Sequence, residues 1–101
     1  MAQPISDLAD YTVVAWVIEP DSWRLVFDSS DGESIIQHKL GGVSRWRTSE
    51  LRDAVGVLEI RVNAALDGAL TYTIDTVCNE VIEVVCADVH ETHIKHRTQK
   101  R

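Results

Sequence analysis

The chain has 101 residues, 45% of them apolar and 26% charged, and a formal net charge of −6 at pH 7. This length suits a single folded domain, and the composition excludes a disordered chain. No apolar run reaches the ~20 residues of a membrane-spanning helix, and no basic start followed by an apolar stretch marks a secretory signal, so we expect a cytoplasmic protein with no membrane partner.

Acidic and basic residues are segregated along the chain. Residues 1–33 and 62–91 each carry a net charge of −6, whereas residues 39–61 carry +2 and residues 95–101 carry +4. Because affinity for nucleic acid depends on neutralising phosphate, we expect the acidic body not to bind DNA or RNA directly. We predict a single β-rich domain over residues 1–94, followed by a basic C-terminal tail.

Three strands are predicted in the first half of the chain. Thr12–Glu19 is apolar on both faces, which predicts a strand that is covered on both sides. Trp23–Asp28 alternates apolar and polar residues after a turn that contains proline. The acidic turn at 29–32 then leads to Ser34–Leu40, which stops at a pair of glycines.

The middle of the chain predicts a basic, irregular segment followed by a short helix near residues 49–55. Thr48 or Ser49 can cap the first turn of this helix, and Gly56 can end it in a left-handed conformation. Trp46 lies in the irregular segment, where a large apolar ring contacts either a partner or the core of its own domain.

The second half repeats the pattern of strands, with Leu58–Ala64, Leu70–Asp75 and Val81–Cys86. Alternation places Leu58, Ile60 and Val62 on the apolar face of the first of these strands, and Leu70, Tyr72 and Ile74 on the buried face of the second. Periodicity does not decide whether the segment 88–97 is a further strand or a helix. In total we predict a mainly β (β-rich α+β) fold with six or seven mostly antiparallel strands and one short helix.

A shift of the chain by 47 residues aligns residues 11–35 with residues 58–82, so that turns and apolar faces coincide. This self-alignment predicts two duplicated three-stranded units that are joined by a connection over 43–56. The alternative is coincidence, because any two series of strands share a period of two.

Each half contains a strand that ends in aspartate and runs into an acidic turn. These segments are Leu25-Val26-Phe27-Asp28 followed by Gly32, and Tyr72-Thr73-Ile74-Asp75 followed by Glu80. Glu91-Thr92-His93-Ile94 stands where a Glu-Ala-Trp-type closing motif would be, with His93 in place of tryptophan, and the second acidic turn lacks a glycine. Over nearly the whole chain this pattern resembles small uncharacterised bacterial β-rich domains, some of which are similar to immunity proteins of polymorphic toxin systems. The resemblance implies a binding protein and carries over no catalytic residues.

Three histidines, His90, His93 and His96, recur at every third residue near the end of the chain. On a helix, neighbouring pairs would share a face, and Cys86 could complete a zinc site with His90. On a strand, His93 points away from the other two, and no common site forms. We expect a solvated basic segment and no metal.

The two cysteines, Cys78 and Cys86, have acidic neighbours, which raise the pKa of a thiol and oppose nucleophilic catalysis. We expect both to be reduced and mostly buried. The chain has no glycine-rich phosphate loop, no nucleophile elbow and no nucleotide fingerprint. We therefore expect no enzyme activity and no cofactor.

The charge pattern favours stoichiometric binding. Our hypothesis is an immunity or inhibitor protein that blocks a basic protein partner such as a toxin, by presenting acidic turns and faces that speed association. The predicted partner-binding residues are Asp28, Asp31, Glu33, Asp75, Glu80 and Glu83.

Two alternatives come from other classes of function. The protein could bind and sequester a small ligand or a nucleotide, as in phage anti-defence, with cationic and stacking contacts from Arg45, Trp46, Arg47 and Arg61. It could instead be an oligomeric structural subunit that assembles through exposed strand edges.

Overall fold

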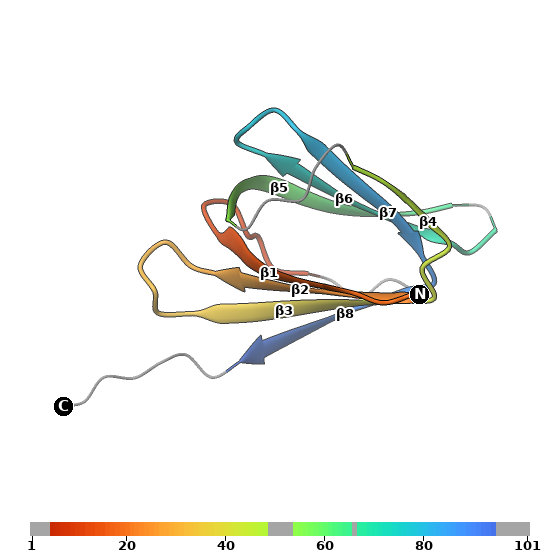
Figure 1. Cartoon of the computed structure of the whole chain (residues 1–101), viewed down its shortest axis with the longest axis horizontal. Coiled ribbons are helices and arrows are strands. Elements are labelled where there is room, and N and C mark those ends of the chain that lie inside the picture. The colour runs from red at the N-terminus through yellow and green to blue at the C-terminus, as the bar shows by residue number, and fades with distance from the viewer. Residues whose placement is uncertain (1–4, 49–53, 66, 95–101) are drawn as a thin grey trace.

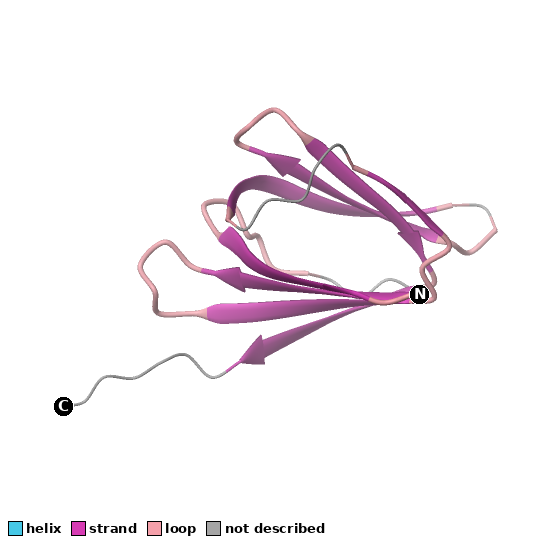
Figure 2. Cartoon of the chain, viewed as in Figure 1, coloured by secondary structure: helices cyan, strands magenta, loops and turns pink. Residues whose placement is uncertain are grey.

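The computed structural model describes residues 5–48, 54–65 and 67–94. They form eight antiparallel strands in one open sheet, in the order β4-β7-β6-β5-β1-β2-β3-β8. The strands are β1 (Thr12–Ile18), β2 (Ser22–Asp28), β3 (Ile35–Gly41), β4 (Arg45–Arg47), β5 (Val55–Ala64), β6 (Leu70–Thr76), β7 (Val81–Cys86) and β8 (Asp88–Ile94). Within these residues there is no helix (Figure 2), and hence none long and apolar enough to cross a membrane.

The sheet folds over on itself, so that two four-stranded halves face each other (Figure 1). At the fold, β1 and β5 pair only through Thr12 with Gly56 and Val13 with Val55, and β5 then bulges between Val57 and Glu59. The inward side chains of both halves form a common core, because alternate residues of each strand point to the same face. Its largest buried members include Trp23, Leu25, Phe27, Leu70, Tyr72 and Ile74.

On the opposite side of the molecule, two chain segments cross between the halves. β3 continues into β4, and β7 continues into β8, so each segment has one strand in each half. At the crossing, the backbone N–H of Ala87 donates to the carbonyl of Gly41 over 2.8 Å. A Cβ atom on Gly42 would lie 2.7 Å from the Cβ of Ala87, so the close approach depends on this glycine.

The strand order is symmetric about the β5–β1 pair. In this symmetry β5, β6 and β7 correspond to β1, β2 and β3, and the fourth strands are exchanged, because β4 pairs with β7 while β8 pairs with β3. The predicted three-stranded units therefore match the first three strands of each half. Their origin by duplication stays a prediction.

The number of strands is higher than the predicted six or seven for two reasons. Residues 45–47, predicted to be irregular, form the short strand β4, and the undecided segment forms β8 up to Ile94. The predicted helix at 49–55 falls mostly on residues 49–53, which lie outside the described residues, but Val55 at its end is wrong as a helical residue because it begins β5.

Two predictions of burial are wrong. β1 is not covered on both sides: Val13 is buried on the inner face, whereas Val14 and Val17 are exposed, and so is Ile18 at the end of the strand. Leu58 was expected on the inner face of its strand, but the β5 bulge turns it outward, and its side chain is 55% exposed.

Candidate functional site

Two acidic turns lie at the same end of the molecule. The turn between β2 and β3 and the turn between β6 and β7 both point to the left in Figure 1. Strands β2 and β6, which correspond in the two halves, both run toward this end, so the turns that follow them lie there together. Five of the six predicted partner-binding carboxylates lie in or beside these turns, and we call them the acidic end: Asp28, Asp31, Glu33, Asp75 and Glu80.

The first turn is held rigid by hydrogen bonds to its own side chains. The hydroxyl of Ser29 donates to Asp31 Oδ1 over 2.6 Å, and the backbone N–H of Glu33 donates to the same oxygen over 3.0 Å. These two bonds lower the pKa of the Asp31 carboxyl below its ordinary value. With Asp10 and Tyr11 of the N-terminal segment, the turn lines a shallow hollow of about 310 Å³.

The second turn combines acidic and apolar side chains. Its Thr76 hydroxyl donates to the carbonyl of Glu80 over 2.9 Å, which closes the turn. Beside it, a hollow of about 260 Å³ is lined by Leu58, Asp75 and Val81 among others. Leu58 and Val81 are more than half exposed, and so is the neighbouring Val77. We call Leu58, Val77 and Val81 the apolar patch.

Glu83, the sixth predicted carboxylate, lies elsewhere. It projects from the outer face of β7 and pairs in the ladder with Arg47 of β4. Arg45 and Trp46 share a hollow with these two residues. Arg61 lies on β5 of the same half and forms an ion pair with Asp75 at 3.2 Å, outside that hollow.

A buried polar network that the sequence analysis missed links the two halves. The side chains of His38 on β3 and Tyr72 on β6 are fully buried and hydrogen-bonded to each other through His38 Nδ1. His38 Nε2 is 2.8 Å from Glu91 Oε2 on β8. An ionised carboxylate only accepts, so Nε2 carries the proton and donates to Glu91, while Nδ1 accepts from the hydroxyl of Tyr72.

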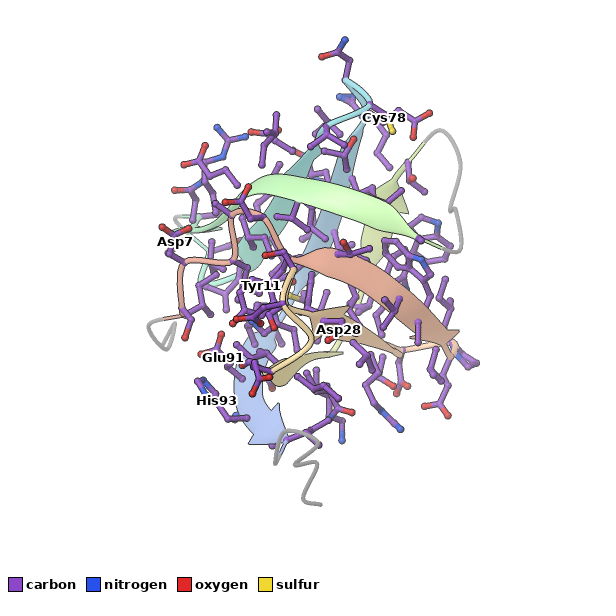
Figure 3. All side chains as sticks on the ribbon, turned by 90° about the vertical axis from the view of Figure 1, so that its left-hand side faces the viewer. Asp7, Tyr11, Asp28, Cys78, Glu91 and His93 are labelled. Carbon is purple, nitrogen blue, oxygen red and sulfur yellow. The ribbon has the colours of Figure 1, made fainter. Side chains whose placement is uncertain are left out.

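The network continues to the surface through Glu91. Ser6 of the N-terminal segment donates its backbone N–H to Oε2 over 3.0 Å and its hydroxyl to Oε1 over 2.9 Å. His93 Nε2 lies 3.2 Å from Oε1 (Figure 3 shows both side chains). Glu91 therefore fastens the N-terminal segment, with its buried Leu8, to strand β8.

The environment sets the protonation of each member of this network. Burial lowers the pKa of His38 and raises that of Tyr72 well above its ordinary value. Burial alone would raise the pKa of Glu91, but the hydrogen bonds from His38, Ser6 and His93 lower it to about 2. The arrangement is thus a neutral tyrosine and histidine bound to a carboxylate.

The hydroxyl of Tyr72 forms the inner end of this network and lies inside the core, while Glu91 and His93 form its outer end. A structural role follows, in which the network satisfies polar atoms that burial would otherwise leave unpaired. One signal in the sequence was available: His38 alternates with Ile36 and Leu40, which places a polar side chain on the inner face of its strand.

The cysteines and the terminal histidines separate in space. Cys86 is buried, and burial together with Asp88 raises its pKa to about 11. Cys78 is exposed at the second acidic turn, so the prediction that it is mostly buried is wrong. Strand β8 points His90 and His93 to opposite faces, while His96 lies outside the described residues. Among the residues with described positions, no three His, Cys, Asp or Glu side chains are grouped to hold a metal ion.

Comparisons with known families, curated proteins and solved structures find no match to this chain.

Proposed function

We propose that this protein is a non-catalytic binding module, an immunity or inhibitor protein, whose acidic end docks on a basic protein partner. The observation that supports this function is the meeting of two acidic turns, far apart in the sequence, at one end of the molecule beside exposed apolar side chains. The resemblance of the repeated strand and turn pattern to immunity-type domains points in the same direction.

The chemistry of this end suits a protein interface. Protein interfaces commonly combine an apolar centre with a polar rim, and here the apolar patch adjoins Asp75 and Glu80. Hydrogen bonds hold the carboxylate of Asp31 in place before binding, and in the second turn they fix the backbone from which Glu80 projects, so less conformational entropy is lost on association. The negative charges gathered at one end of the molecule also steer a cationic partner and speed its approach.

The test compares two triple variants that change the net charge equally. One variant, Asp31→Asn/Glu33→Gln/Glu80→Gln, neutralises the acidic end. The control, Glu19→Gln/Asp21→Asn/Asp67→Asn, neutralises turns at the other end of the molecule. A partner captured from the source cells by the unaltered protein is identified and purified, and its association kinetics are measured at several salt concentrations.

We expect a basic partner whose association rate falls about tenfold with the first variant and changes little with the control. The salt dependence of association should also flatten in the first variant alone. Capture of no basic protein, or equal association rates for the two variants, would contradict the proposed function.

A further inference from the structure

The outer face of the half that contains β4, β7 and β6 carries a row of three paired side chains. Arg45 of β4 pairs with Val85 of β7, and Val85 pairs with Thr71 of β6. Directly paired residues of neighbouring strands project from the same face of a sheet. A guanidinium, an aliphatic side chain and a hydroxyl therefore lie side by side across three strands.

A second row lies beside the first. Arg47 pairs with Glu83, and Glu83 pairs with Thr73. The carboxylate of Glu83 offsets the charge of Arg47, whereas the ladder neighbours of Arg45 carry no negative charge. The surface thus has local positive charge on a protein that is acidic as a whole.

These rows enclose a hollow of about 420 Å³ at the edge of the sheet. Trp46 pairs with the buried Val84, so its half-exposed ring projects from the inner face, where its centroid is 5.7 Å from that of the buried Trp23, and only its backbone faces the rows of Arg45 and Arg47. The hollow is lined by Arg45, Trp46, Arg47, Thr71, Glu83 and Val85.

We propose that this hollow binds an oxyanion, a phosphate or a carboxylate, carried by a ligand with a small apolar part. Arg45 and Arg47 are two residues apart on one strand, so their guanidinium groups start ~7 Å apart and can close on one anion from two sides. The hydroxyl of Thr71 supplies a further donor. Val85 and the aliphatic stem of Arg45 form the apolar surface against which the rest of the ligand packs.

This site is independent of the acidic end. Arg45 and Arg47 lie on the edge strand β4, and neither lines the hollows of the two acidic turns. The triple variant that neutralises the acidic end should therefore leave anion binding unchanged, so the two proposals can fail separately.

The test uses three aromatic probes that differ in one group: phenyl phosphate, benzoate and benzyl alcohol. Each is titrated into the ¹⁵N-labelled protein while amide and indole N–H signals are recorded. We expect saturable shifts at the backbone amides of Trp46, Thr71 and Val85 with one or both anionic probes and none with the neutral alcohol. The tighter of the two anions identifies the oxyanion as phosphate or carboxylate.

Three variants decide whether the arginines bind the probe. Arg45→Gln and Arg47→Gln should each weaken the anionic probe about tenfold, as expected for the loss of a charge-assisted hydrogen bond. Arg61→Gln, on the same half but paired with Asp75, is the matched control and should change the affinity less than twofold. The spectrum of each variant without probe shows whether it is folded. If Arg45→Gln does not fold, Arg45→Lys takes its place, because it retains the charge but loses the paired donors of the guanidinium group.

Three results would overturn the site. These are the absence of saturable shifts, equal shifts from benzyl alcohol, and an affinity that Arg45→Gln, Arg47→Gln and Arg61→Gln leave unaltered.

Discussion

Glu91 joins parts of the molecule that lie far apart in the sequence. Its carboxylate accepts hydrogen bonds from His38 in the core and from Ser6 in the N-terminal segment. The pKa of Glu91 falls from 4.5 to about 2 on folding, and that of His38 falls below 6.5. In both cases the unfolded chain binds protons more readily than the folded protein, so acid favours unfolding.

We predict that the free energy of unfolding decreases in two stages as the pH falls. The contribution of His38 is lost as the pH drops below 6.5 toward its lowered pKa, and that of Glu91 is lost between about 4.5 and about 2. Urea denaturation at a series of pH values measures both stages. A stability that is constant from pH 7 to pH 3 would contradict this account.

The variant Glu91→Gln tests the same network at neutral pH. It should lower the free energy of unfolding by about 2 kcal/mol, because charge-assisted hydrogen bonds to the buried His38 are weakened. The lower stage of the acid profile should also disappear. Glu59→Gln, on an exposed part of β5, is the control and should stay within about 0.5 kcal/mol of the unaltered protein.

At the scale of elements, the crossing at Gly42 controls how the two halves meet. Its φ angle is +63°, in the left-handed region that disfavours residues with a Cβ atom. Its backbone also approaches Ala87 too closely for a side chain. Gly32 has a similar φ of +73° but has open space where a Cβ would lie. Replacing Gly32 by alanine therefore measures the cost of the positive φ angle without any steric contact.

We predict that Gly42→Ala destabilises the protein more than Gly32→Ala. Gly32→Ala should cost about 1 kcal/mol through backbone strain alone, whereas Gly42→Ala adds the steric contact with Ala87. Adding Ala87→Gly to Gly42→Ala should recover part of the loss, since it removes the contacting Cβ. Equal effects of the two alanine variants in chemical denaturation would show that the crossing tolerates the extra atom.

At the scale of the whole molecule, the exchanged fourth strands make the halves depend on each other. β8 completes the half formed by β1, β2 and β3, and β4 completes the half formed by β5, β6 and β7. The core is shared as well, since the ring of His38 contacts that of Tyr72 across the halves. Neither half can bury its inner face without the other.

We therefore predict that two fragments, cut within residues 49–53, are each unfolded when alone. Each lacks the strand that covers its third strand and the opposite face of the core. An equimolar mixture should regain the β-sheet circular dichroism of the intact protein. Cooperative unfolding of either isolated fragment would contradict this prediction.

Local alternation explains which strands could be predicted. Val81–Cys86 is a strand with the predicted bounds, and Leu70, Tyr72 and Ile74 are buried as expected. Arg45–Arg47 could not be found in this way, because three residues are too few to show a period. The exposure of Leu58 could not be predicted, because the bulge that reverses the side-chain alternation arises from the pairing of β5 with β6 and leaves no mark in the sequence of β5 alone.

By itself, the sequence determined that this protein is rich in antiparallel strands, that its carboxylates gather in two turns, and that basic side chains surround Trp46. These features depend on neighbouring residues, and alternation and turn chemistry are local. Only the tertiary structure decided that the two turns share one end, that Glu83 faces Arg47, and that His38 meets Glu91. These juxtapositions depend on pairing between residues distant in the chain, and it is the folding of one sheet over its own core that selects them.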